Sequence, residues 1–152
     1  MTVTWYLLLK YLHVLLAITA LGSNITYAVW KALSAREPAH APFALKGIAF
    51  IDNRVANPAY GGLLITGLVL LAVGQVGFRG WVIAALILFA LLIVVAIGFY
   101  SRAVRQQIQV MDAEGVESAA YKRLDGQAML YGIISLVIAL AIVFMMVVKP
   151  FP

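Results

Sequence analysis

The sequence predicts an all-α integral membrane protein, a four-helix bundle with a short interfacial helix before the second span. Hydrophobic residues make up 64% of its 152 residues and charged residues only 11%, whereas a soluble domain has about 45–50% and about 25%. Four apolar stretches are long enough to cross the roughly 30 Å hydrocarbon core as helices. Strands of a β-barrel would be about half as long and would alternate in polarity. At this length we expect a single domain, residues 1–152.

The first predicted span covers residues 5–30 and the second covers residues 58–76. Aromatic pairs bracket the first span, Trp5 with Tyr6 and Tyr27 with Trp30, as amphipathic rings do at membrane interfaces. We expect Asn57 to cap the second span, because Asn is a favoured N-cap and Pro58 suits the first helical position.

The segment before the second span, residues 43–52, is apolar but too short to cross the membrane. It predicts an interfacial helix, or a buried shoulder of the bundle, that stops within residues 53–57. Residues 38–42 are predicted to form a loop, since they contain Pro38 and Pro42.

The third predicted span covers residues 81–100 and the fourth covers residues 129–148. Trp81 and Tyr100 stand at the two ends of the third span, where they are expected to face the interfaces. Val104, Ile108 and Met111 follow at helical spacing, which predicts that the third helix continues past the membrane as an amphipathic extension. A turn is expected at residues 112–115.

Basic residues give the predicted orientation. Most of the 11 Lys and Arg residues fall between the first and second spans or between the third and fourth. By the positive-inside rule both of these loops lie in the cytoplasm, so both termini lie outside a bacterial inner membrane. The net charge of +5 is therefore assigned to membrane topology rather than to nucleic-acid binding. The chain has no cysteine, which excludes disulfides, thiolate zinc sites and iron–sulfur clusters.

His13 is the residue that carries most of the functional signal. It lies about 10 Å along the first helix from Tyr6, inside the apolar slab, where ionisable groups are costly and usually functional or paired. It is a candidate axial ligand of a haem iron or a proton carrier. The alternative is a neutral imidazole that is hydrogen-bonded to a neighbouring helix. Lys10 lies on the same face, one turn nearer the outer surface, and is able to extend its ammonium group outward.

A second axial ligand, if there is one, has several candidates. Met145 and Met146 lie near the outer end of the fourth span, in the same leaflet as His13, and Met is a known haem ligand. Plain packing is the alternative for both methionines. Water, or the His13 of another protomer, are further candidates. His40 lies in a loop on the other side and is expected to be solvated.

Small and polar residues mark the facing sides of the first two spans. They predict a close contact between the two helices, because small residues allow close approach and hydroxyl and amide groups bond across it. The residues are Gly22, Ser23, Asn24 and Thr26 in the first span and Gly61, Gly62, Thr66 and Gly67 in the second. Nearby, Asp52 and Arg54 are expected to form an interfacial ion pair, with a gate or proton port as the alternative.

Three segments together resemble a known group of proteins. They are Tyr6-Leu-Leu-Leu-Lys10-Tyr-Leu-His13, the stretch from Asp52 through Asn57-Pro58 to Thr66-Gly67, and the ending Met145-Met146-Val-Val-Lys149-Pro150. Over nearly its whole length the chain resembles an uncharacterised bacterial family of predicted four-helix integral membrane proteins. That family is similar in layout to the copper-resistance protein D family and to HemJ-type membrane protoporphyrinogen oxidases.

The resemblance to the HemJ type implies haem b, with His13 as the candidate iron ligand and Lys10 as a partner for a propionate. Those proteins carry an Arg just after the first helix and a Lys in the third, where this chain has Val29-Trp30-Lys31 and a wholly apolar stretch. The resemblance therefore implies haem binding rather than the oxidase reaction.

Two functional hypotheses follow. The first is a haem b-binding membrane protein with a redox or tetrapyrrole-related role. The second is a non-enzymatic scaffold or assembly subunit, a homo- or hetero-oligomer within the lipid bilayer. A small transporter is less favoured, because the polar residues of the spans are too sparse to line a pathway.

Overall fold

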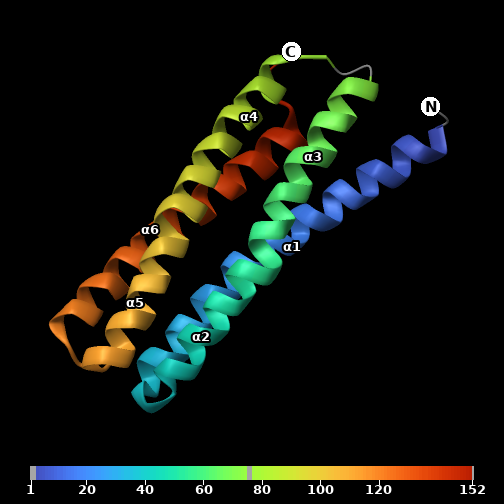
Figure 1. Cartoon of the computed structure of the whole chain (residues 1–152). Helices are drawn as coiled ribbons and strands as arrows, with labels where there is room; N and C mark the ends of the chain where they lie inside the picture. Colours follow the sequence, from blue (N-terminus) through green and yellow to red (C-terminus); the bar gives the residue numbers. More distant parts are fainter. Residues whose placement is uncertain (1–2, 75–76, 152) are drawn as a thin grey trace.

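Four long helical rods lie side by side in this computed structural model, which describes residues 3–74 and 77–151 (Figure 1). Within those residues, four helices are long and apolar enough to cross a membrane. The first rod is α1 (Val3–Arg36), and the last is α6 (Ala119–Val148). The second consists of α2 (Ala41–Ile51), η2 (Asp52–Ala56) and α3 (Asn57–Val73). The third consists of α4 (Gly80–Ile93), η3 (Val94–Tyr100) and α5 (Ser101–Glu114). The predicted four-helix architecture is confirmed.

Each rod is longer than the span predicted for it, and all of them continue beyond the apolar stretch at one end of the bundle. That end holds the turns around residues 37–40 and 115–118, and we call it the basic-loop end. The beginning of α1 and the end of α6 lie at the opposite end, which we call the terminal end (Figure 1). The predicted end of the second span, residues 75–76, lies outside the described residues.

The rods associate as two pairs. α1 packs along α3 and α2, and α4 with α5 packs along α6. Stacked rings and polar contacts join the two pairs toward the basic-loop end, as between Tyr27 and Tyr100 and between Lys31 and Asp125. Tyr60 of α3 still meets Phe89 of α4 edge to face, with ring centroids 6.4 Å apart.

The short helix predicted before the second span is present as α2, but the predicted stop after it is wrong. The backbone passes through η2, a π-helical turn, directly into α3, and the N–H of Asn57 still bonds the carbonyl of Asp52. A proline within a regular α-helix clashes with the carbonyl four residues earlier. The wider turn just before Pro58 accommodates its ring, so the helix is not interrupted.

One further expectation about this rod is corrected. Asn57 is not an N-cap, because Ala56 before it already has helical backbone angles. Of the two alternatives for the segment before the second span, the buried shoulder describes α2, since Ala44, Leu45 and Ile48 are buried against the rest of the bundle.

The amphipathic extension of the third helix is confirmed as α5. Val104 and Met111 are buried there, and Ile108 packs against the core. The helix ends at Glu114, and Gly115 supplies the positive φ of 84° that closes it. Ser118 then caps α6, because its hydroxyl accepts a hydrogen bond from the backbone N–H of Tyr121 at 3.2 Å.

Three aromatic residues expected at the membrane interfaces lie inside the bundle instead. Tyr27, Trp81 and Tyr100 are 5%, 8% and 4% exposed. The rings of Tyr27 and Tyr100 stack in parallel with centroids 5.5 Å apart. The ammonium group of Lys149 lies 5.4 Å from the ring centroid of Trp81. Packing between helices, rather than the lipid interface, fixes these side chains.

Ala128 tests the packing between α5 and α6, because its side chain is 0% exposed. Ala128→Leu should lower the free energy of unfolding by about 1–3 kcal/mol, the usual cost of extra methylenes in a filled core. The matched control is Gly126→Leu, where an added side chain meets nothing within 4 Å. Thermal unfolding in mild detergent measures both variants, and equal destabilisation would contradict the packing described here.

Candidate functional site

His13 faces α3 from the terminal half of α1. Its Nδ1 atom lies 2.8 Å from the hydroxyl oxygen of Thr66, and the side chain is half-buried. A Cβ atom built on Gly67 would come within 3.1 Å of the imidazole Cε1, so the absence of a side chain at Gly67 gives the ring its place. The neighbouring-helix hydrogen bond that the sequence offered as one alternative for His13 is therefore present.

The hydrogen bonds of Thr66 define which imidazole nitrogen carries the proton. The Thr66 hydroxyl donates its one hydrogen to the carbonyl of Gly62 at 2.7 Å, as hydroxyls on membrane helices often do. It is then free only to accept from His13, so Nδ1–H is the donor and Nε2 keeps its lone pair. A ligating histidine is commonly oriented by a bond from its other ring nitrogen.

The other residues of the predicted haem site lie on separate parts of the fold. Lys10 is exposed on α1, one turn nearer the terminal end than His13. Met145 is half-buried and Met146 is 38% exposed, and both lie near the end of α6. α6 packs mainly against α4, whereas His13 contacts α3. His40 is exposed and pairs with Glu37, with Nδ1 and Oε2 2.9 Å apart.

The predicted close contact between the first two spans is confirmed. A Cβ atom on Gly62 would lie 2.9 Å from a methyl group of Leu16, so the absence of a side chain lets α3 approach α1. Asn24 donates a hydrogen bond to the hydroxyl of Tyr60 at 2.9 Å, which links the same two helices further along. Thr26 bonds instead to the carbonyl of Gly22 in its own helix.

A second polar site surrounds Asp52, and it is the most enclosed one that the described residues form. Asp52 is 3% exposed. Ser101 Oγ lies 2.5 Å from Asp52 Oδ2, and the hydroxyl of Tyr27 lies 3.5 Å from Oδ1. The ion pair expected with Arg54 is wrong, because Arg54 points to the exposed side of η2. We call Asp52, Ser101, Tyr27 and Tyr100 the Asp52 centre.

Both π-helical turns of the structure border the Asp52 centre. Asp52 begins η2, Tyr100 ends η3, and Ser101 follows directly. π-Turns within α-helices are uncommon and occur frequently at functional sites. Two buried oxygens here have no hydrogen-bond partner among the described residues, the hydroxyl of Tyr100 and Oδ1 of Asn57. Unpaired buried oxygens are costly. These two oxygens remain available to accept further hydrogen bonds.

A third polar layer joins the two helix pairs at the basic-loop end. Lys31 of α1 forms an ion pair with Asp125 of α6 and donates to Gln107 Oε1 of α5 at 3.2 Å. Gln107 also donates to Asp125 at 2.7 Å and is 0% exposed. The sequence placed Lys31 in a loop, but α1 extends past it, and the ion pair fixes α1 against α5 and α6.

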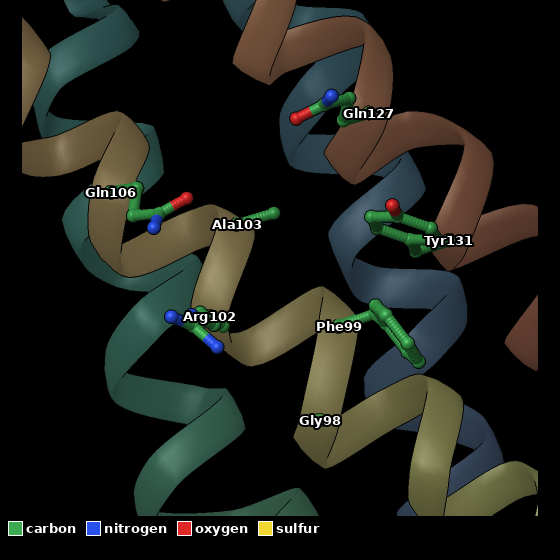
Figure 2. A pocket seen from close by; sticks show the side chains of 7 residues that line it. All are labelled: Gly98, Phe99, Arg102, Ala103, Gln106, Gln127 and Tyr131. Atoms are coloured by element: carbon green, nitrogen blue, oxygen red, sulfur yellow. The ribbon is translucent and has the colours of Figure 1, made fainter.

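A hollow of about 220 Å³ lies between the third rod and α6 (Figure 2). Gly98 and Phe99 form its part on η3, and Gln127 and Tyr131 line it from α6. In the described part of the chain, no three His, Cys, Asp or Glu side chains gather as an all-protein metal site would require.

The sequence did not reveal the Asp52 centre, because the four residues that form it come from three different rods. One signal was present: Asp52, Ala56, Tyr60, Leu63 and Thr66 recur at helical spacing across the segment expected to break. An uninterrupted helix over that pattern places Asp52 on the same face as Thr66, toward α1.

These features define the class: a multi-pass integral membrane protein whose apolar bundle encloses polar sites at separate levels. The chain belongs to the family described as "Predicted integral membrane protein (DUF2269)", whose family model matches residues 7–150. Comparisons with curated proteins and with solved structures give no match.

Gln107 tests the polar layer at the basic-loop end. Gln107→Leu removes the amide that both Lys31 and Asp125 use, and should lower the free energy of unfolding by about 1–3 kcal/mol. The control is Gln109→Leu on the exposed side of α5. Denaturant unfolding in detergent micelles measures both. If the two variants are equally stable, this layer does not hold the pairs together.

Proposed function

We propose that this protein binds haem b through Nε2 of His13 and serves a redox or tetrapyrrole-related role in the membrane. The observation that carries the proposal is the hydrogen bond between His13 Nδ1 and the hydroxyl of Thr66. With that hydroxyl donating to the carbonyl of Gly62, Nδ1 carries the proton and Nε2 has a free lone pair. Neutral imidazole held in this way is a typical axial ligand of haem iron.

The surrounding residues fit such a group in two respects. Gly67 leaves the imidazole room against α3, and the adjoining helix faces are apolar. Lys10 lies one turn nearer the terminal end, where its ammonium group would meet a propionate. Met145 and Met146 stand as candidate second ligands only if α6 approaches α1 more closely than it does in this structure. When bound, haem would supply one-electron chemistry, and the protein would orient it and exclude water.

The spectrum of the purified protein tests this proposal. Protein from cells supplied with haem precursor should show a Soret band and sharp reduced α and β bands, with about one haem per chain by pyridine haemochrome. His13→Ala should abolish these bands, while His40→Ala should keep them. Thr66→Val should weaken haem binding about 10–100-fold, the usual effect of losing the group that orients a ligand. Thr19→Val is its control, because Thr19 bonds only within α1.

Unchanged haem content in His13→Ala would overturn the role of His13. A colourless, folded wild-type protein would overturn haem binding altogether. That second result would favour the other candidate function, a scaffold or assembly subunit of a larger membrane complex. The observation behind this candidate is the exposure of two large aromatic side chains in the first turns of α1, Trp5 at 65% and Tyr11 at 63%.

We further propose that the basic-loop end faces the cytoplasm of a bacterium and that both termini lie outside its inner membrane. Arg36, Arg102 and Arg123 are exposed at that end, in accord with the positive-inside rule. Alkaline phosphatase fused after Pro152 should be active, and the same enzyme inserted at Gly115 should be inactive. The reverse pattern would overturn this orientation.

A further inference from the structure

The Asp52 centre has a hydrogen-bond arrangement that accepts two protonation states. Ser101 Oγ lies 2.5 Å from Asp52 Oδ2 and 3.0 Å from the carbonyl oxygen of Ala96. The serine hydroxyl has one hydrogen, and the carbonyl oxygen only accepts. If Asp52 is the neutral acid, it donates to Ser101, and Ser101 donates to Ala96. All three groups are then paired.

The ionised state can be paired as well. In η3 the backbone N–H of Ser101 bonds the same Ala96 carbonyl. The Ser101 hydroxyl can therefore turn toward an ionised Asp52 while the Ala96 carbonyl keeps a donor.

The groups around Asp52 offer its carboxyl group hydrogen bonds but no ion pair. No Lys, Arg or His pairs with Asp52 in the described residues, and an isolated buried carboxylate is costly. The titratable, polar and charged groups on the elements packed around it are Tyr27 of α1, Asn57 and Tyr60 of α3, Tyr100 of η3, Arg105 of α5 and Asp125 of α6. Lys31 is already paired with Asp125.

We propose that Asp52 is a reversible proton-binding site that exchanges with water at the basic-loop end of the bundle. On release, the O–H bond of the carboxyl group breaks and its proton passes to water at the layer formed by Lys31, Gln107 and Asp125. The Ser101 hydroxyl then turns from the Ala96 carbonyl to the carboxylate. Uptake reverses both movements. Asp125 of that layer has a side chain that is 40% exposed, and Tyr100, next to Ser101 in the chain, has no hydrogen-bond partner for its hydroxyl among the described residues.

Infrared spectroscopy of the protein in lipid vesicles, recorded across pH, tests this site without any cofactor. The wild type should show a C=O stretching band of a protonated carboxyl group that disappears reversibly as the pH rises. Asp52→Asn should remove this band, and the amide can still bond both Ser101 and Tyr27, so the fold should persist. Asp112→Asn should leave the band in place, because Asp112 is an exposed carboxylate that pairs with Lys46.

Two results would overturn the proposal. If no band depends on Asp52 at any pH at which the protein is folded, the carboxylate is permanently ionised. If a band depends on Asp52 but does not change with pH, the group is a fixed structural acid.

Ser101→Ala separately tests the hydroxyl. In this variant the C=O stretching band of protonated Asp52 should move to higher frequency, because the acid loses one hydrogen bond. The control is Ser135→Ala, another buried serine, on α6. A band unmoved in Ser101→Ala, or moved equally in Ser135→Ala, would remove Ser101 from the site.

Discussion

The fold depends on one constraint: a polar side chain that enters the apolar bundle has to find its partner within the protein, on another helix or on its own backbone, because lipid offers none. α1 shows this most clearly. His13, Asn24, Tyr27 and Lys31 face inward from one side of the helix, and each meets a polar group of another rod. Ala20, between these levels, is buried. His13, Ala20 and Tyr27 are each seven residues apart, about two turns, which is the repeat of left-handed helix packing. The partners of these residues set the register of the bundle.

The two π-turns are consequences of the same constraint. Each lies beside the one buried carboxyl group of the Asp52 centre. Asp52 and Thr66 share the side of the second rod that faces α1. Tyr100 and Ser101, at the end of η3, lie toward Asp52, while α5 still buries Val104 and Met111. The irregular backbone is compatible with the membrane because it stays hydrogen-bonded and enclosed.

Sequence reasoning predicted what depends on local composition. The four spans, the extension that became α5 and the contact of the first two spans follow from apolar length, helical spacing and small residues. The turn predicted at residues 112–115 begins later, because α5 continues to Glu114. Sequence reasoning failed where the outcome depends on a distant partner. Asn57 and Pro58 are residues typical of a helix start, yet the helix continues through them, because a π-turn precedes them. Tyr27 and Tyr100 are placed in the sequence as interface anchors would be, yet their rings stack on each other between α1 and the third rod. Asp52 could not be placed until Ser101, far along the chain, was seen beside it.

The two proposed sites occupy different levels of one helix pair, and this limits how they could cooperate. From His13 to Tyr27 is about 21 Å along α1, so no hydrogen bond joins the imidazole to the Asp52 centre directly. The intervening contacts are the close apolar approach of Leu16 to Gly62 and the hydrogen bond from Asn24 to Tyr60. A change at Asp52 could reach His13 only by moving α3 along α1 as a unit, since Asp52, Gly62 and Thr66 belong to one continuous rod. The continuity of α2, η2 and α3 is therefore the feature on which any coupling of the two sites rests. A break near Asn57, as the sequence suggested, would have left the two sites independent.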